Sequence, residues 1–374
     1  MAPVGFELRF NRGSRCRIFI RRGLIETLSH NAEFSGASSI AIVTDETVRK
    51  LYASALAEKL EKVAQVYLVA IPPGEKSKTL ETVSDVCSQF NSHGLDRKSI
   101  IVSLGGGVVG DLAGFAASIF KRGVRLCHVP TTLLAQVDSS IGGKNGVDVP
   151  WGKNQLGTFY EPSAIFIDPD TLDSLPGREL INGISEMVKS GIIADRRLFK
   201  GISKVFRDER SKDGAICTAK DLKHLIQPTC KVKMEIVQKD ELEANLRSIL
   251  NYGHTVGHAI EASSNYNLSH GRAVLLGMLC EGWISQELGI FEQKDYDEEK
   301  EVLLKIAEAY DVRLEHTDRN KVFSFALSDK KSTGGNLRMS LPERIGRMHQ
   351  SAEGKYTVPV SRELFENSLD ETCW

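Results

Sequence analysis

An α/β domain with a mostly parallel, Rossmann-like sheet, followed by an all-α C-terminal domain, is predicted by two features of the sequence. In the first half, short β-branched runs alternate with stretches of helical periodicity, which is typical of parallel strands covered by helices. In the second half, strand signals fade from about Pro176 and long helical patterns dominate. We therefore expect two domains, residues 1–175 and 176–374.

The expected elements follow from these patterns in chain order. Five runs rich in Val and Ile predict the strands 40–44, 66–71, 100–104, 126–129 and 164–168. Amphipathic stretches predict that helices 46–63 and 79–93 connect the first three strands. The helices expected in the second domain are 178–193, 218–237, 248–263, 271–288 and 298–310.

Composition excludes several classes of protein. The chain has 374 residues, 41% hydrophobic and 26% charged, and its 48 basic and 49 acidic residues give a net charge of -1. This balance argues against a dedicated nucleic-acid binder, which would have a basic excess. The most apolar stretch, 99–120, is interrupted by glycines and by Asp111, so we expect no membrane span.

Cysteine usage bears on the cellular compartment. The seven cysteines are an odd number, widely spaced and without a C-x-x-C pair. Scattered reduced thiols are typical of a cytosolic enzyme. We therefore expect a cytoplasmic protein, and an organelle-targeting segment upstream stays open as an alternative.

A glycine-rich segment, 105–111, follows the third expected strand. It fits G-x-G-x-x-G at the start of a helix, where backbone N–H groups can receive a pyrophosphate. No acidic residue follows about 20 residues later, so this is not a standard Rossmann fingerprint. A tight turn that requires glycine is the alternative. Asp45, which ends the first strand, could hold a ribose hydroxyl, and segment 73–78 follows the second strand.

Three of the nine histidines, His254, His258 and His270, lie close together in the sequence. His254 and His258 are spaced i, i+4 and share a helix face. Neutral imidazoles with a third protein ligand are typical of an open catalytic zinc site. Glu186 is a reasonable carboxylate partner. Spacing alone favours His254 and His258 as the ligand pair.

Segment 130–157 is rich in glycine, small polar residues and lysine, which predicts ligand-facing loops. Asn154 could donate a hydrogen bond to a phosphate group there. Cations that could hold an anionic substrate are Arg122, Lys144, Lys153, Lys233, Arg247, Lys330 and Lys331.

Together these motifs resemble the dehydroquinate synthase family of sugar-phosphate cyclases over nearly the whole chain. The matching segments are 105–111, 130–134, 138–144, 152–154, 186–189, 250–259 and 270–271. The resemblance implies a dehydroquinate synthase-like fold, a homodimer, bound NAD and bound Zn²⁺, with Co²⁺ as an alternative. It implies no nucleic-acid or membrane partner.

The reaction implied by the resemblance is a cyclisation of 3-deoxy-arabino-heptulosonate 7-phosphate to 3-dehydroquinate with phosphate release. Alcohol oxidation, phosphate elimination, re-reduction and an intramolecular aldol step follow one another, so NAD is recycled. Such an enzyme is a carbon–oxygen lyase of the shikimate pathway of aromatic amino acid biosynthesis.

The resemblance also implies a role for individual residues. The metal ligands become Glu186, His254 and His270, because His258 matches a substrate-contacting residue. The implied catalytic residues are Asp138, Lys144, Lys189, Asn251 and His258. The implied substrate-binding residues are Lys144, Asn154, Lys233, Arg247, Asn251, His258, Lys330, Lys331 and, from a neighbouring subunit, Arg122. The implied NAD site comprises Asp45, Glu75, Lys78, Gly106, Gly107, Val109, Asp111, Thr131, Thr132 and Lys153.

The presence of both Lys233 and Arg247 favours a substrate that carries a carboxylate. Three departures from the family pattern, Asn145, the pair Asp148-Val149, and Arg272, leave an amino analogue, sedoheptulose 7-phosphate or another sugar phosphate open as the substrate. Arg272 reverses a charge beside His270 and could alter the surroundings of the metal. A metal-dependent polyol dehydrogenase of the iron or glycerol type and a non-catalytic relative are the competing interpretations.

Overall fold

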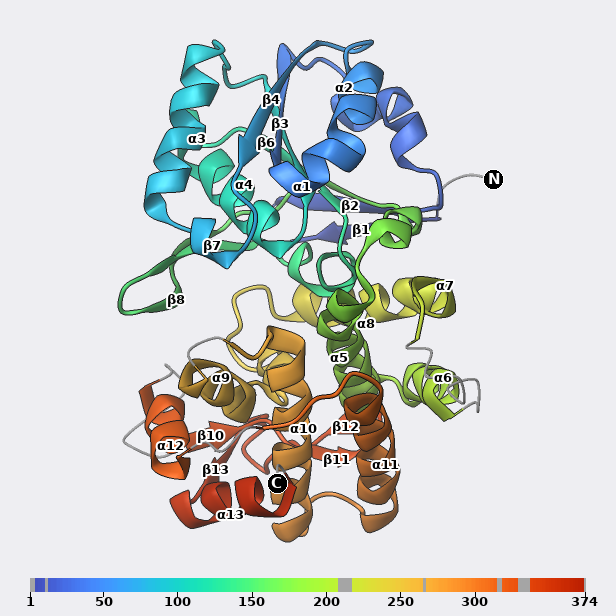
Figure 1. Ribbon diagram of the computed structural model, residues 1–374, viewed down its shortest axis with the longest axis vertical. Helices are drawn as coiled ribbons and strands as arrows, with labels where there is room; N and C mark the ends of the chain where they lie inside the picture. Colours follow the sequence, from blue (N-terminus) through green and yellow to red (C-terminus); the bar gives the residue numbers. More distant parts are fainter. Residues whose placement is uncertain are drawn as a thin grey trace. The chain divides into compact units, whose positions relative to one another are not determined.

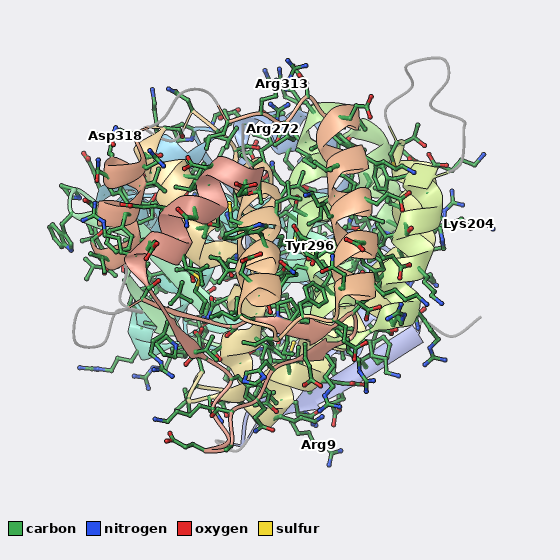
Figure 2. The ribbon with its side chains drawn as sticks, turned by 90° about the horizontal axis from the view of Figure 1, so that it is seen from below. Arg9, Lys204, Arg272, Tyr296, Arg313 and Asp318 are labelled. Atoms are coloured by element: carbon green, nitrogen blue, oxygen red, sulfur yellow. The ribbon has the colours of Figure 1, made fainter. Side chains whose placement is uncertain are left out.

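The computed structural model describes residues 4–10, 13–207, 217–264, 267–314, 318–328 and 337–372 (Figure 1; side chains in Figure 2). The chain forms two compact units, Met1–Leu175 and Pro176–Trp374. The cofactor and substrate roles assigned to two such domains stay predictions. Among the described helices, none combines the length and apolarity that a membrane span requires.

A seven-stranded sheet forms the centre of the N-terminal unit, in the order β1-β2-β9-β6-β5-β3-β4. Its strands are Val4–Arg9 (β1), Arg15–Ile20 (β2), Ser39–Asp45 (β3), Gln65–Ile71 (β4), Ile100–Gly105 (β5), Arg125–Pro130 (β6) and Ala164–Ile167 (β9). Only β1 is antiparallel to its neighbour; all other pairs are parallel. The predicted mostly parallel sheet is confirmed.

Helices cover both faces of this sheet (Figure 1). They are Glu46–Val48 (α1), Ser54–Leu60 (α2), Leu80–Ser92 (α3) and Gly107–Ile119 (α4). Because side chains alternate along a strand, Ile40 and Ile42 of β3 pack in the core beneath α2, whereas Ala41 and Val43 pack beneath α3 and α4. Strands buried on both faces read as continuous apolar runs, which is why the sequence revealed them.

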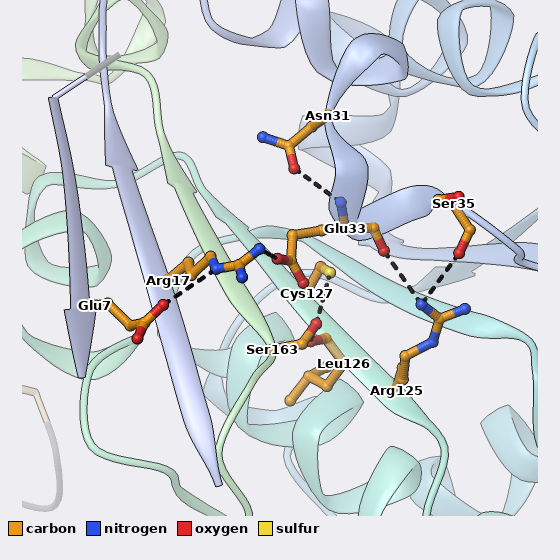
Figure 3. A network of polar contacts seen from close by, with 9 residues as sticks. All are labelled: Glu7, Arg17, Asn31, Glu33, Ser35, Arg125, Leu126, Cys127 and Ser163. Atoms are coloured by element: carbon orange, nitrogen blue, oxygen red, sulfur yellow. Dashed lines mark hydrogen bonds and ion pairs between the residues drawn. The ribbon is translucent and has the colours of Figure 1, made fainter. Parts of the chain in front are cut away.

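Ion pairs and backbone contacts tie the edge ribbon β1-β2 to the rest of the unit (Figure 3). Arg17 contacts Glu33 at 2.5 Å and Glu7 at 3.4 Å. Arg125 of β6 donates to the carbonyls of Glu33 and Ser35 at 3.3 and 3.5 Å.

The segment expected as ligand-facing loops contains a hairpin, Lys144–Val149 (β7) and Gly152–Phe159 (β8), after a helical turn at 135–139. Gly146 and Gly157 face each other, and a Cβ on Gly146 would lie 2.6 Å from the Leu156 carbonyl oxygen. The side-chain amide of Asn145 donates to the carbonyls of Gly143 and Tyr160. The sequence analysis interpreted these glycines as loop residues. In the structure they lie in paired strands and permit the two strands to approach closely.

Helices dominate the C-terminal unit. They are Gly177–Ala194 (α5), Arg196–Arg207 (α6), Ala219–Leu222 (α7), Ile226–Lys239 (α8), His254–Ser263 (α9), His270–Glu287 (α10), Gln293–Ala309 (α11), Arg319–Ser328 (α12) and Arg362–Thr372 (α13). Tyr296 of α11, labelled in Figure 2, is buried and packs edge-on against Phe291 with ring centroids 6.2 Å apart.

Four short strands add to this helical unit. Leu337–Met339 (β10) pairs with Val358–Val360 (β13), and Pro342–Arg344 (β11) pairs with Arg347–Met348 (β12). Segments of two or three residues carry too little periodicity to be predicted from sequence. The predicted fold class, a mostly parallel Rossmann-like sheet followed by a helical region, is confirmed.

Candidate active site

The carboxyl ends of β4, β3, β5 and β6 form one edge of the N-terminal sheet, and several predicted NAD residues follow them directly. Asp45 ends β3, and its Oδ1 accepts hydrogen bonds from the N–H groups of Thr47 and Val48 at 2.8 and 2.9 Å. Thr131 follows β6 and donates its N–H to the Gly105 carbonyl at 3.0 Å. Ligands of open α/β sheets bind at such an edge.

The glycine turn brings the chain unusually close to its neighbours. Gly106 immediately precedes α4, and a Cβ there would lie 3.0 Å from Thr132 Cγ2. A Cβ on Gly107 would lie 3.1 Å from Ser139 Oγ. A cavity beside the turn is lined by Ser103, Gly105, Gly106, Asp111, His128 and Ser139, among others. Backbone N–H groups at this helix start can receive a pyrophosphate.

Lys78 contacts both Asp111, which was predicted to bind NAD, and Asn154, which was predicted to bind the substrate phosphate. Its Nζ lies 2.5 Å from Asp111 Oδ2 and 2.5 Å from Asn154 Oδ1. Burial alone would lower the pKa of Lys78, but Asp111 outweighs it and raises that pKa. The Asn154 N–H donates to Asp148 Oδ1 at 2.8 Å, so Asp148, one of the departures, anchors the hairpin.

The remaining predicted residues of the N-terminal unit are more scattered. Val109 is buried on α4, Asp138 lies in the helical turn 135–139, and Lys144 is exposed at the start of β7. Lys153 Nζ lies 3.8 Å from Glu75 Oε1. Arg122 has a φ of 66° in the turn after α4.

In the C-terminal unit, the predicted metal residues come from three helices. Glu186 and Lys189 lie on α5, His254 begins α9, and His270 begins α10. A Cβ on Gly271 would lie 2.7 Å from the Ile181 carbonyl oxygen, so this glycine lets α10 approach α5 closely. The close approach places His270 beside Glu186.

Glu186, His254 and His270 form a compact cluster. One ligand atom from each lies within 4.8 Å of the others. Glu186 Oε1 lies 3.3 Å from His254 Nε2 and 3.4 Å from His270 Nε2. The Lys189 ammonium forms an ion pair with Glu186 Oε2. A carboxylate and two imidazoles are a donor set that Zn²⁺ accepts.

The other nitrogen of each imidazole contacts a protein acceptor. His254 Nδ1 lies 3.0 Å from the Tyr252 carbonyl oxygen, and His270 Nδ1 lies 3.6 Å from Glu261 Oε2. Protons on both Nδ1 atoms would leave the Nε2 lone pairs facing Glu186. Such outer partners orient metal-binding imidazoles.

The electrostatics of the cluster are asymmetric. Burial lowers the pKa of His254 to about 3. Burial also acts on His270, but Glu186 and Glu261 outweigh it and raise the pKa of His270 to about 9. Burial would raise the pKa of Glu186, yet Lys189 and His254 hold that pKa well below its usual range. The cluster therefore holds one proton that a metal ion would displace.

His258, favoured as a ligand by spacing alone, belongs to a second group with Glu261 and His270. Its ring centroid lies 5.1 Å from that of His254 and 5.9 Å from that of His270. The structure thus places His258 beside the cluster of Glu186, His254 and His270. This arrangement is compatible with a substrate-contacting role.

Two of the predicted anion-binding residues of this unit, Lys233 and Arg247, are buried. Lys233 is buried on α8, and buried Arg247 donates from Nη1 to the Glu241 carbonyl at 2.6 Å. Asn251 donates its amide to Glu243 Oε1 at 2.8 Å. Lys330 and Lys331 lie outside the described residues.

Arg272, which departs from the family pattern beside His270, points its side chain to the C-terminus of α11. Its guanidinium donates to the carbonyl of Tyr310, the C-cap residue of α11, at 3.0 Å (Arg272 is labelled in Figure 2). A guanidinium at a helix C-terminus is favourable.

Sequence reasoning missed several residues that lie at the two candidate sites. Ser103, His128 and Ser139 line the cavity at the glycine turn. Glu281, buried on α10, accepts from the N–H groups of Gly253 and Val256 and so fixes the start of α9. Lone buried polar residues within apolar runs are the signal that was available for Ser103, His128 and Glu281.

Comparison with known proteins identifies the family. Residues 68–182 match the family described as 3-dehydroquinate synthase N-terminal, and 183–332 match 3-dehydroquinate synthase C-terminal. A 3-dehydroquinate synthase of Thermodesulfovibrio yellowstonii is 39% identical over 98% of this chain and 99% of its own.

Two solved structures have the same fold. One is 2-deoxy-scyllo-inosose synthase complexed with carbaglucose-6-phosphate, NAD⁺ and Co²⁺, at a TM-score of 0.87 and 27% identity over 99% of this chain and 100% of that one. The other is ValA, a 2-epi-5-epi-valiolone synthase from Streptomyces hygroscopicus subsp. jinggangensis with NAD⁺ and Zn²⁺ bound, at 0.81 and 25% over 95% and 96%. The chain therefore belongs to the 3-dehydroquinate synthase family.

Proposed function

We propose that this chain is an NAD- and zinc-dependent 3-dehydroquinate synthase of the shikimate pathway, which converts 3-deoxy-arabino-heptulosonate 7-phosphate to 3-dehydroquinate and phosphate. The observation that carries the proposal is the buried cluster of Glu186, His254 and His270 in a chain that matches 3-dehydroquinate synthases over nearly its full length.

The cluster fits a divalent cation. Both carboxylate oxygens of Glu186 are buried, and Oε2 forms an ion pair with the Lys189 ammonium. The other oxygen, Oε1, lies beside the Nε2 atoms of His254 and His270, where a bound cation would compensate its buried charge. A bound Zn²⁺ or Co²⁺ supplies Lewis-acid polarisation of substrate oxygens. Glu186, His254 and His270 would hold it, with Tyr252 and Glu261 orienting the two rings.

The edge of the N-terminal sheet fits NAD. The backbone N–H groups at the start of α4, which follows Gly106, would receive the pyrophosphate, and Asp45 presents a carboxylate at the neighbouring strand end. Bound NAD supplies reversible hydride acceptance, so the overall reaction has no net redox change.

The protein's own side chains would position the substrate and balance its charge. Lys233 and Arg247 would bind the carboxylate, and Lys144, Asn154 and Asn251 would bind the phosphate together with Arg122, Lys330 and Lys331. Asp138, Lys189 and His258 would contact the hydroxyl groups that react. Because a phosphate held in place can accept its own leaving proton, catalysis then depends mainly on positioning and on charge stabilisation.

Phosphate release measured with three substrates tests the proposal. With NAD⁺ and Zn²⁺ present, the heptulosonate phosphate should release phosphate while absorbance at 340 nm stays flat. Turnover of sedoheptulose 7-phosphate or glucose 6-phosphate alone would contradict the substrate. Steady NADH accumulation without phosphate release would instead identify a polyol dehydrogenase.

We further propose a homodimer in which Arg122 reaches the phosphate site of the partner. Arg122 occupies a left-handed turn, and Ile119, Trp151 and Phe159 of the same unit are exposed at 48%, 73% and 45%. Exposed large apolar side chains favour a protein interface. Mixing Arg122→Ala with Glu186→Gln should restore activity in heterodimers, whereas a monomer by light scattering would contradict the proposal.

A further inference from the structure

A buried serine–histidine pair lies beneath the glycine turn and has no part in the function proposed above. Ser103 of β5 and His128 of β6 are register partners on adjacent parallel strands, so their side chains point to the same face of the sheet. They are 3% and 4% exposed, and Ser103 Oγ lies 2.5 Å from His128 Nδ1. The hydroxyl therefore fixes the orientation of the ring.

The second ring nitrogen, Nε2, has no such partner. Ser103 is the one hydrogen-bond partner of the His128 side chain among the described residues. Buried ring nitrogens are normally satisfied by the protein, by water or by a ligand. His128 lines the cavity together with Gly105, Gly106 and Asp111. The nitrogen is thus available to a group that enters this cavity.

The chemistry of the lining indicates what that group is. Burial lowers the pKa of His128 to about 4, so the ring is neutral at physiological pH. A phosphate group only accepts, so it would suit only the tautomer with the proton on Nε2. A hydroxyl group both donates and accepts, so it suits either tautomer of the imidazole. In a dinucleotide, the ribose hydroxyls lie next to the pyrophosphate that the glycine turn would bind.

We propose that His128 is a further dinucleotide-binding residue, whose Nε2 forms a hydrogen bond with a ribose hydroxyl of the bound cofactor, and that Ser103 is its positioning residue. This inference rests on the proposed function, because it requires the dinucleotide to bind at the glycine turn. The hydrogen bond from His128, which lines the cavity, would add to the NAD contacts expected from residues at the strand ends.

Calorimetric titration with NAD⁺ tests the inference on the metal-loaded enzyme. His128→Leu, which removes both nitrogens, should weaken NAD⁺ binding about tenfold, in line with the loss of one buried hydrogen bond. His128→Gln, which keeps a polar group, should stay within about threefold of wild type. Ser103→Ala should fall between the two. Cys127→Ala is the matched control, because Cys127 is buried on the same strand but faces the other side of the sheet.

Four NAD⁺ analogues that each lack one ribose hydroxyl separate a direct contact from a structural effect. One analogue should bind the wild type weakly and lose no further affinity in His128→Leu or Ser103→Ala. If every analogue loses as much affinity in the variants as NAD⁺ does, or if His128→Leu binds NAD⁺ like wild type, the inference is overturned. Should His128→Leu fail to fold, Ser103→Ala gives the same test with the four analogues. A wild type that binds no dinucleotide would instead overturn the proposed function, and this inference with it.

Discussion

The two candidate sites differ in the kind of residue that forms them: glycines at the edge of the N-terminal sheet, and buried charged residues in the C-terminal unit. At the edge of the N-terminal sheet, Gly106 and Gly107 let the backbone approach the side chains of Thr132 and Ser139 closely. The cluster of the C-terminal unit relies on buried charge, with Glu186 surrounded by Lys189 and two imidazoles. One site is therefore sensitive to added volume, and the other to changed charge.

Glycine also serves the charged cluster, but for a different reason. Gly271 lets α10 approach the backbone of α5 and so places His270 against Glu186. At the sheet edge, glycine makes room for side chains of neighbouring segments; between the helices, it makes room for the backbone of another helix.

Neutralising the charged cluster should have the largest effect. Glu186→Gln keeps the shape of the side chain but removes the charge that balances Lys189 and the metal ion. Zinc sites bind with about 10–16 kcal/mol shared among their ligands, so losing one ligand should cost roughly 3 kcal/mol or more, at least about a hundredfold in affinity. Zinc content measured by mass spectrometry and the rate of phosphate release should both fall strongly. A variant that retains its zinc and near-normal turnover would remove Glu186 from the metal site.

The buried cations should discriminate between substrates. Arg247→Ala should weaken productive binding of the carboxylate substrate by about 2–5 kcal/mol, as expected for a buried charge partner. The measurement is kcat/KM for phosphate release. Arg344→Ala, an exposed arginine on β11, is the control. An unchanged kcat/KM would place the substrate carboxylate elsewhere.

Added volume should act on the other site alone. In Gly106→Ala the new methyl group would lie about 3.0 Å from Thr132 Cγ2, so the turn that would bind the pyrophosphate must shift. We expect NAD⁺ affinity to fall by about tenfold, or 1.4 kcal/mol, while zinc content stays at the wild-type level. Titration of the variant with each ligand checks both expectations. Loss of zinc would show that the two sites are not independent.

The sequence predicted the elements that bury continuous apolar faces and missed those that do not. Strands β3 and β5 and helices α5 and α10 lie close to their predicted ranges, because long buried segments leave continuous or periodic apolar runs in the sequence. The hairpin β7-β8 has glycines at the paired positions 146 and 157 and lacks such runs. The short strands β10 to β13 are set by tertiary contacts rather than by local pattern.

Candidate site residues were predictable where several reactive types cluster in the sequence. His254, His258 and His270 stood out for this reason. Spacing alone favoured His254 and His258, whereas the cluster of Glu186, His254 and His270 depends on how α5, α9 and α10 pack. His128 is a single histidine within an apolar strand. Its register with Ser103 requires the pairing of β5 with β6, which no local pattern contains.

Proton release should sharpen the contrast between the sites. Because the pKa of His270 is raised to about 9 from its ordinary 6.5, the metal-free cluster carries a proton at neutral pH. Zinc binding should therefore release about one proton per ion below pH 9 and fewer above it, whereas NAD⁺ binding should release none. Calorimetry in buffers of different ionisation enthalpy gives the count. Equal proton counts for the two ligands would contradict the charge asymmetry.

The same shift predicts how the metal-free protein responds to pH. A folded-state pKa above the unfolded value means that the folded state binds the proton more tightly. The stabilising contribution of His270 should thus be fully present below pH 6.5 and lost as the pH rises to about 9. Denaturant unfolding across this range should show the decline in wild type and a weaker one in His270→Ala.

The smallest effect is expected at Arg272, where a charge departs from the family pattern beside His270. Because its guanidinium donates to the carbonyl that ends α11, Arg272→Ala should lower the free energy of unfolding by about 0.3–1 kcal/mol. Zinc affinity should stay unchanged, since this hydrogen bond is directed to a helix end rather than to the metal cluster. Chemical denaturation and competitive zinc titration measure the two quantities separately. A zinc affinity altered tenfold or more would show that the charge beside His270 acts on the cluster despite its partner on α11.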